Sequence, residues 1–315
     1  MSKSLLGVND IEDIVNRLLT HTASLINHVY WVKQKFDILP DHDHIGMSIN
    51  YVDLKEFRNE FLNELVNTIC EWVYSNKKAM KIIDEFIKED NRSILNAQSA
   101  LRTLAFSKFR KIEGQDVYSQ GQFGELLLFN FIQHFFHAVP LLRKMAITTS
   151  EGHERFGADA IHYKYENDKN IIILGESKVY KSDYQFKNAF EKSLESILST
   201  YNKHTEELNL YLYDDFLDDD LVPIAKSYKQ GKLKNVEVQL VCLIAYNETK
   251  TIDKVNEMQI KKEIVNIIEE RCNSLEKEIF KCISSEGLLP RMNYLIFPVW
   301  NLEDLLINFQ RLIGR

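Results

Sequence analysis

The sequence predicts a mixed α/β fold in which a helical N-terminal region precedes a core built around a sheet. Apolar residues recur every three or four positions along the first part of the chain, which is a helical period. After Gly114, helix-like and strand-like segments follow in the order helix, three strands, helix, strand, an α/β arrangement. Hydrophobic residues make up 45% of the 315 residues, with only 11 glycines and 5 prolines, as in a globular protein.

Residues 1–114 are expected to form the helical region. Between residues 53 and 77, apolar side chains recur at helical spacing and form one stripe, with charged residues opposite. This stripe consists of Phe57, Phe61, Leu62, Leu65, Ile69, Trp72 and Val73. The polar segment 41–44, Asp-His-Asp-His, is expected to interrupt the helices as a loop. A second amphipathic helix, with a basic end, is expected over residues 91–112.

Residues 115–315 are expected to contain the sheet. This part begins with a helix that is apolar almost all round, and Ser119 with Gln122 three residues later matches a capping box. Apolar, β-branched and aromatic runs predict strands over residues 141–149, 159–165, 170–178, 236–246 and 293–300. Helical periods predict helices over residues 182–203, 253–284 and 302–313.

Charge and cysteine content narrow the class of protein. Lys and Arg total 39 against 46 Asp and Glu, a net charge of -7, so any nucleic-acid site must be a local basic patch. The four cysteines form no Cys-x-x-Cys pair, which argues against a zinc knuckle and fits reduced core thiols. Charges near the N-terminus and the lack of a run of about 18 apolar residues predict a cytoplasmic protein without a membrane span.

Charged residues stand at the ends of two central predicted strands. Glu176 and Lys178 are two residues apart, so their side chains leave the same face of one strand. Asp159 lies at the start of the preceding strand, where an antiparallel hairpin brings it beside Glu176. Glu125 lies within the apolar helix, and a buried carboxylate needs a partner or a metal ion. Three carboxylates and one ammonium group are therefore expected to converge.

This set of groups predicts metal-assisted hydrolysis of a phosphodiester. Mg²⁺ prefers carboxylates, waters and substrate phosphates as ligands. A lysine beside the metal ion can orient the attacking water or help to deprotonate it, and it can balance the charge that develops on the phosphate.

The same residues carry a family resemblance. Glu125, Gly-Ala-Asp159 and Glu176-Ser-Lys178 resemble the motif of PD-(D/E)xK nucleases, except that an alanine precedes the aspartate where those enzymes have proline. Residues 157–182, with Gly-Glu-Leu-Leu-Leu-Phe upstream, are further similar to the HamA family, the nuclease subunits of the Hachiman antiphage system. The similarity covers roughly residues 119–203. It implies a restriction-endonuclease-like mixed-sheet core.

The resemblance also implies an activity and a partner. It implies a Mg²⁺-dependent DNA nuclease, for which Mn²⁺ is a substitute, that acts in antiphage defence together with the HamB helicase. In this interpretation Asp159 and Glu176 bind the metal ion with the carbonyl of Ser177, Lys178 assists the water, and Glu125 supports the same or a second metal ion. Basic residues that flank the motif are candidate DNA contacts: Arg102, Lys108, Arg110, Lys111, Lys181, Lys187 and Lys192.

Structural interpretations of these residues stay open. Glu125 can pair with a core arginine, and Lys178 can form a simple salt bridge to Glu176. The histidines are expected to be packed or exposed rather than metal ligands: His42, His44, His134, His137 and, on the other face of its strand, His162. For the whole protein, the alternative is a non-catalytic nuclease-like subunit that docks on and regulates a helicase. The apolar stripe and the acidic segment 214–220 are the candidate docking surfaces; the alternative is that the stripe packs within this chain and the acidic segment is a solvated loop.

Overall fold

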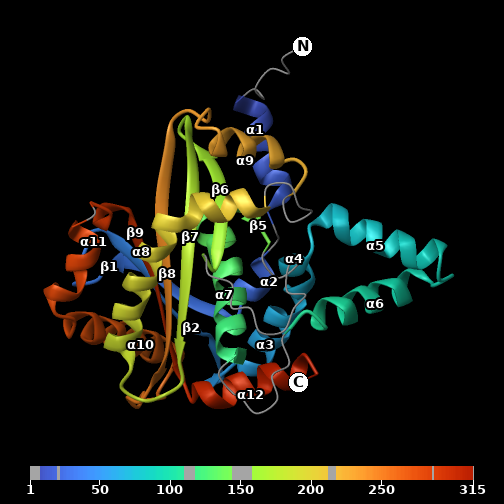
Figure 1. The fold of residues 1–315 in the computed structure, drawn as a ribbon. Coiled ribbons are helices and arrows are strands. Elements are labelled where there is room, and N and C mark those ends of the chain that lie inside the picture. The colour runs from blue at the N-terminus through green and yellow to red at the C-terminus, as the bar shows by residue number, and fades with distance from the viewer. Residues whose placement is uncertain are drawn as a thin grey trace.

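The computed structural model describes residues 8–19, 22–109, 118–143, 158–211, 218–285 and 287–314. Its centre is a seven-stranded sheet in the order β1-β2-β9-β8-β7-β6-β5 (Figure 1). The strands are β1 (Val29–Lys35), β2 (Asp43–Ile49), β5 (Val139–Leu142), β6 (Ala160–Glu166), β7 (Lys169–Tyr180), β8 (Val236–Glu248) and β9 (Met292–Trp300). β3 (Tyr51–Val52) and β4 (Lys55–Glu56) form a separate hairpin. The α/β class is therefore confirmed.

The sheet is parallel in its centre and antiparallel at both edges. β7, β8, β9 and β2 pair in parallel, whereas β5, β6 and β7 form an antiparallel meander and β1 pairs antiparallel with β2. The continuous apolar run Ile171–Leu174 in β7 is buried, because a central strand is covered on both faces. Ile171 and Ile173 join one hydrophobic cluster and Ile172 and Leu174 join the other.

Helices form a layer on each face of the sheet. α7 (Tyr118–Phe136) packs on one face, with α12 (Leu302–Leu312), α3 (Arg58–Asn67) and α4 (Ile69–Val73) beside it. α8 (Phe186–Tyr211) covers the other face, together with α10 (Glu257–Asn273) and α9 (Val222–Lys229). Other described helices are α1 (Val8–Leu18), α2 (Ala23–Ile26), η2 (Lys277–Phe280), α11 (Lys281–Ser285) and η3 (Leu289–Arg291). β7 thus lies between α7 and α8.

Two further helices extend away from the sheet. α5 (Asn76–Lys88) and α6 (Ile94–Phe106) form a hairpin that projects from the body of the molecule (Figure 1). Side-chain hydroxyls cap both helices, since Ser75 accepts from the amide of Lys78 and Ser93 from that of Asn96. α6 confirms the middle of the helix predicted over residues 91–112, but it ends at Phe106, and residues 110–112 lie outside the described part of the chain.

The expectation of a wholly helical N-terminal region is wrong. β1 and β2 lie in this region and extend the main sheet. From Tyr30 to Lys35, β1 alternates between half-buried and exposed side chains, a strand period that the predicted helical region did not include. Asp43 and His44, expected in a loop, begin β2, whose partner β9 lies far away in the sequence. The boundary that we predicted at residue 114 stays a prediction.

The apolar stripe of residues 57–73 is not a docking surface. Six of its seven side chains, all except Phe57, are buried in the protein's own core: Phe61, Leu62, Leu65, Ile69, Trp72 and Val73. They pack around α7 and α12 on one face of the sheet. The stripe therefore stabilises the fold, and the docking hypothesis for it is wrong.

Two helix boundaries also differ from prediction. α7 begins at Tyr118, so Ser119 lies inside the helix rather than at its cap. The helix expected over residues 253–284 ends at Asn273, where Ser274 donates to the last turn, and the shorter helices η2 and α11 follow. No glycine or proline marks this break in the sequence. Among the described helices, none combines the length and apolarity that crossing a membrane requires.

Candidate functional site

The β6–β7 hairpin places Asp159 beside Glu176. Its two turn residues, Asn167 and Asp168, both have positive φ, 52° and 58°, the conformation that a tight two-residue hairpin needs and that these residue types tolerate. The turn fixes the register, in which Ala160 pairs with Gly175. The same register, continued by one residue beyond the ladder, sets Asp159 opposite Glu176, as the sequence predicted, although Asp159 precedes β6 by one residue.

α7 lies directly against this end of β7 because of one glycine. A Cβ atom on Gly124 would lie 2.6 Å from Val179 Cγ2 and 2.9 Å from Ser177 Oγ. The missing side chain therefore allows the helix to approach the strand at Ser177. Glu125, the next residue of α7, is half-buried. Its predicted role in supporting a metal ion stays a prediction.

Asp159 is held through one of its two carboxylate oxygens. Oδ2 accepts a hydrogen bond from the backbone amide of Ser177 at 2.8 Å and another from the hydroxyl of Ser177 at 3.0 Å. Hydrogen bonds to a carboxylate are among the stronger ones in proteins. They fix the direction in which this carboxylate points, and Oδ1 takes no part in them.

Glu176 is buried and is contacted from two sides. Only 4% of the residue is exposed. Thr200 of α8 donates its hydroxyl proton to Oε1 over 2.5 Å, and Lys178 Nζ lies 3.5 Å from Oε2. The shared face of Glu176 and Lys178, predicted from their spacing, is therefore confirmed. Thr200 was not among the predicted site residues. The only feature that could have indicated it is its position as a polar residue three places after Ile197 on an apolar helix stripe.

Electrostatics keep Lys178 protonated. Burial is the largest influence and by itself lowers the pKa of Lys178, but the carboxylates of Glu176 and Asp159 outweigh it and raise this pKa above its usual value. Lys178 is therefore an ammonium group at neutral pH. Cys242, which pairs with Glu176 in the ladder to β8, is neutral, because burial raises the pKa of its thiol to about 12.

The donor set fits a hard divalent cation. Across the residues that the structure describes, no three His, Cys, Asp or Glu side chains are grouped to hold a metal ion. Mg²⁺ does not require such a group, since one or two carboxylates with waters and substrate phosphates are its usual ligands. Asp159 and Glu176, with the carbonyl of Ser177, the residue after Glu176, match that requirement.

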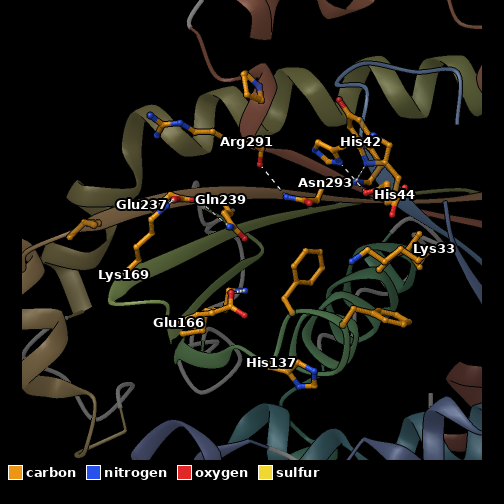
Figure 2. A pocket seen from close by; sticks show the side chains of 18 of the residues that line it. Lys33, His42, His44, His137, Glu166, Lys169, Glu237, Gln239, Arg291 and Asn293 are labelled. Carbon is orange, nitrogen blue, oxygen red and sulfur yellow. Dashed lines mark hydrogen bonds and ion pairs between the residues drawn. The ribbon is translucent and has the colours of Figure 1, made fainter. Parts of the chain in front are cut away.

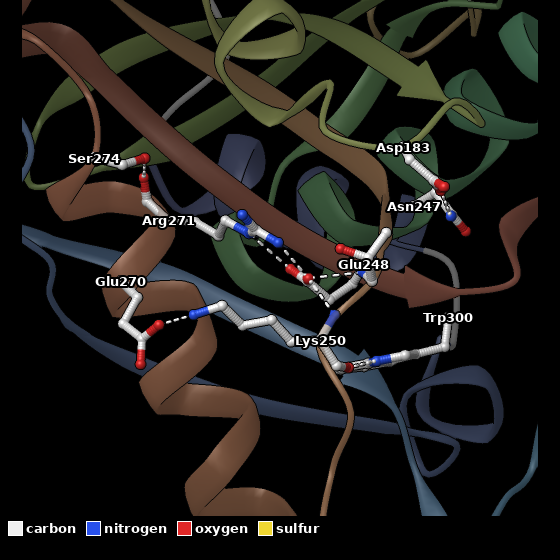
Figure 3. Close-up of polar contacts among 9 residues, drawn as sticks. Asp183, Asn247, Glu248, Lys250, Glu270, Arg271, Ser274 and Trp300 are labelled. Carbon is white, nitrogen blue, oxygen red and sulfur yellow. Dashed lines mark hydrogen bonds and ion pairs between the residues drawn. The ribbon is translucent and has the colours of Figure 1, made fainter.

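A second buried carboxylate stabilises the adjacent end of β8 (Figure 3). Glu248 accepts hydrogen bonds from the backbone amides of Thr249 and Lys250 and from the guanidinium of Arg271, at 2.5–2.9 Å. Burial is the largest influence and by itself raises the pKa of Glu248, but these donors outweigh it and the pKa is lowered. Glu248 is thus a fully paired structural group that anchors the turn after β8.

The candidate DNA contacts that follow β7 are engaged within the chain. Lys181 pairs with Glu303, Lys187 with Glu276 and Lys192 with Glu195, at nitrogen–oxygen distances of 3.0, 2.9 and 2.7 Å. These exposed pairs are weak and can open. Arg110 and Lys111 lie outside the described residues. Of the other candidates, Arg102 donates to Asn67, and Lys108 is half-buried. The DNA-contact role of all these residues stays a prediction.

A polar cavity of about 1070 Å³ lies at the opposite end of β7 (Figure 2). It is lined by charged and polar side chains from the strand ends and by the end of α7, among them Lys33, His42, His44, His137, Lys164, Glu166, Lys169, Glu237 and Arg291. Its cations are largely offset by carboxylates, since Lys164 pairs with Glu166 and Lys169 with Glu237. The residues that line the cavity do not include Asp159, Glu176 or Lys178, so the cavity is separate from the carboxylate site.

The histidines behave as structural groups. His44 is buried, and its two ring nitrogens contact the carbonyl of Pro40 and the amide of Tyr294. Burial, with a smaller contribution from His42, lowers the pKa of His44 to about 4. His134 contacts the hydroxyl of Thr22. His162 lies on the α7 face against Phe129, away from Glu176, as predicted. None of these histidines belongs to a metal-binding group within the described residues.

Comparison with known families gives a match that spans the whole sheet. A family model described as HamA matches residues 27–313, which is nearly the whole chain. The matched region contains β1 to β9 and every candidate residue of the carboxylate site. The comparison with curated proteins finds no match.

Proposed function

This chain belongs to the HamA family, and from that premise we propose that it is a metal-dependent deoxyribonuclease of the Hachiman antiphage defence system. The proposal rests mainly on one observation. The hairpin register, continued by one residue, sets Asp159 opposite Glu176, and Lys178 pairs with Glu176 and is held as an ammonium group by both carboxylates. The order α7, β5, β6, β7, α8, β8 supports a PD-(D/E)xK core around them.

Each residue then has a defined role. The carboxylates of Asp159 and Glu176, with the carbonyl of Ser177, hold the cation. When bound, Mg²⁺ supplies charge that polarises a phosphate and promotes ionisation of a water. The ammonium group of Lys178 orients the attacking water and balances the negative charge that develops on the phosphate. Glu125 supports the same or a second ion.

One assay tests the proposal directly. Purified protein is incubated with plasmid and linear DNA in Mg²⁺ or EDTA, with and without the helicase, and Lys178→Ala serves as the inactive control. Cleavage that requires the metal ion and Lys178 supports the nuclease. Equal cleavage by the wild type and Lys178→Ala would remove the catalytic assignment.

The alternative is a non-catalytic subunit that docks on and regulates a helicase. The ion pair between Lys178 and Glu176 is the observation that favours it, because such a pair can simply stabilise a strand. Under this alternative, substitutions at Asp159 or Glu176 change stability but no cleavage is detected under any condition, whereas helicase binding persists.

The partner in this proposal is the HamB helicase. The acidic segment 214–220 was one candidate contact for it, and residues 214–217 lie outside the described part of the chain. In the remainder, Asp218 is buried, Asp219 pairs with Lys77 of α5, and Asp220 pairs with Arg17 of α1. These pairs hold the segment against its own chain, so a role in helicase binding requires that they exchange partners. Co-purification of wild-type and Asp219→Ser proteins with the helicase tests that role.

A further inference from the structure

Thr200 occupies an unusual position for a helical threonine. It lies in the middle of α8, only 4% of the residue is exposed, and apolar residues of the same helix stripe precede it. A threonine in a helix commonly bonds to a carbonyl of the preceding turn of its own helix. The hydroxyl of Thr200 instead donates to Glu176 Oε1, on the neighbouring strand, over 2.5 Å. A side chain of α8 is therefore used to hold a carboxylate of β7.

The two carboxylates of the candidate site are held in matching ways. Asp159 is held through Oδ2 by the hydroxyl and amide of Ser177. Glu176 is held through Oε1 by the hydroxyl of Thr200, and its Oε2 lies toward Lys178. In each carboxylate one oxygen is bound by a hydroxyl, so rotation of the carboxylate plane is restricted and the second oxygen has a fixed direction.

We propose that Thr200 is a positioning residue that presets the carboxylate of Glu176 for a divalent cation. This inference rests on the proposed function, because it assigns Glu176 as a ligand. The groups that hydrogen-bond to metal ligands fix the orientation of those ligands, and their removal typically lowers metal affinity or activity about 10- to 100-fold. Thr200 lies on an element that contributes no other candidate ligand, so its effect must pass through Glu176.

The experiment separates the hydroxyl from the packing of the side chain. Thr200→Val keeps the branched shape and removes the hydroxyl, Thr200→Ala removes both, and Thr200→Ser keeps the hydroxyl. Thr205→Val, at an exposed position of the same helix, controls for the replacement of a hydroxyl with a methyl group. Binding of Mn²⁺ alone is measured by calorimetry on the full chain, thermal melts report the fold, and the kcat of DNA cleavage is measured separately.

The expected result is a loss of Mn²⁺ affinity of about tenfold or more in Thr200→Val and Thr200→Ala. Thr200→Ser and Thr205→Val are expected to bind like the wild type, and all four variants are expected to remain folded. If Thr200→Val binds Mn²⁺ and cleaves DNA like the wild type, the positioning role is wrong. If the valine and alanine variants both unfold, Thr200 is a structural residue and the inference is equally overturned.

Two further variants distinguish failure of the positioning role of Thr200 from failure of the proposed metal site. Asp159→Asn and Glu176→Gln are measured in the same Mn²⁺ titration. If both lose affinity while Thr200→Val does not, the metal site stands and only the role of Thr200 is refuted. If the wild type binds no Mn²⁺, or both variants bind as tightly as the wild type, the assignment of the metal ligands fails and the positioning role fails with it.

Discussion

Replacing Gly124 with alanine should strain the contact between α7 and β7. The added Cβ would lie 2.6 Å from Val179 Cγ2 and 2.9 Å from Ser177 Oγ, both well inside ordinary contact distance. Valine is stiff at χ1 and cannot easily turn away. The hydroxyl of Ser177 holds Asp159, so a shift there disturbs the candidate site.

Two opposing effects set the magnitude. Forcing an extra methyl group into a packed contact costs about 1–3 kcal/mol. Alanine in place of glycine inside a helix contributes about 1 kcal/mol of stability. Gly124→Ala is therefore expected to destabilise the fold by about 0–2 kcal/mol.

Gly121 supplies a matched control in the same helix. A Cβ atom at Gly121 meets nothing within 4 Å. Gly121→Ala should therefore gain only the higher helix propensity of alanine, which stabilises the folded state by up to about 1 kcal/mol. The difference between the free energies of unfolding of the two variants therefore measures the steric strain at Gly124, about 1–3 kcal/mol.

Urea unfolding at 25 °C measures both stabilities, and DNA cleavage by the folded variants gives the second readout. Gly124→Ala should also cleave more slowly, because Ser177 and with it Asp159 are displaced. The packing argument is refuted if Gly124→Ala is at least as stable as Gly121→Ala and cleaves DNA at the same rate.

Four further predictions follow from the site and the core. Lys178→Ala should abolish cleavage with little change in melting temperature, because its side chain lies at the end of a strand; equal cleavage would contradict this. Asp159→Asn should abolish metal-dependent cleavage yet keep the fold, as an amide oxygen can still accept from Ser177; a metal-activated variant would count against the assignment. Burial lowers the pKa of His44 to about 4, so the unfolded chain binds more protons below about pH 6.5. Stability should therefore be complete above that pH and fall as the pH drops toward 4, and His44→Gln should flatten this dependence in urea titrations. The isolated chain should bind DNA weakly and lose affinity further with salt, because its net charge is -7; tight, salt-resistant binding in a filter assay would refute this.

The elements that could be predicted are those with a strong local signal. β7 and β8 are long apolar runs, and the spacing of Glu176 and Lys178 settles their shared face without any tertiary information. The adjacency of Asp159 and Glu176 follows from a short hairpin, which is also local. These signals were enough to predict the α/β class and the convergence of charges.

The elements and contacts that were not predicted depend on residues far apart in the sequence. β2 is held by β9, and its short apolar run does not distinguish a strand from a buried helix turn. The bond from Thr200 to Glu176 joins a helix to a strand, and no local pattern specifies which helical hydroxyl reaches which carboxylate. The pairing of Lys181 with Glu303 and of Lys187 with Glu276 is likewise decided by the arrangement of distant elements.

The position of β9 between β2 and β8 has a consequence for how the chain folds during synthesis. Residues 250 positions apart, His44 and Tyr294, contact each other where β2 meets β9. Because chains emerge from the ribosome N-terminal end first, the β1–β2 hairpin is made long before the strand that joins it to β8. Closing so long a loop makes this a late and slow step of folding. A nascent chain therefore carries Asp159 and Glu176 on an unfinished sheet until β9, which ends at Trp300, has been added.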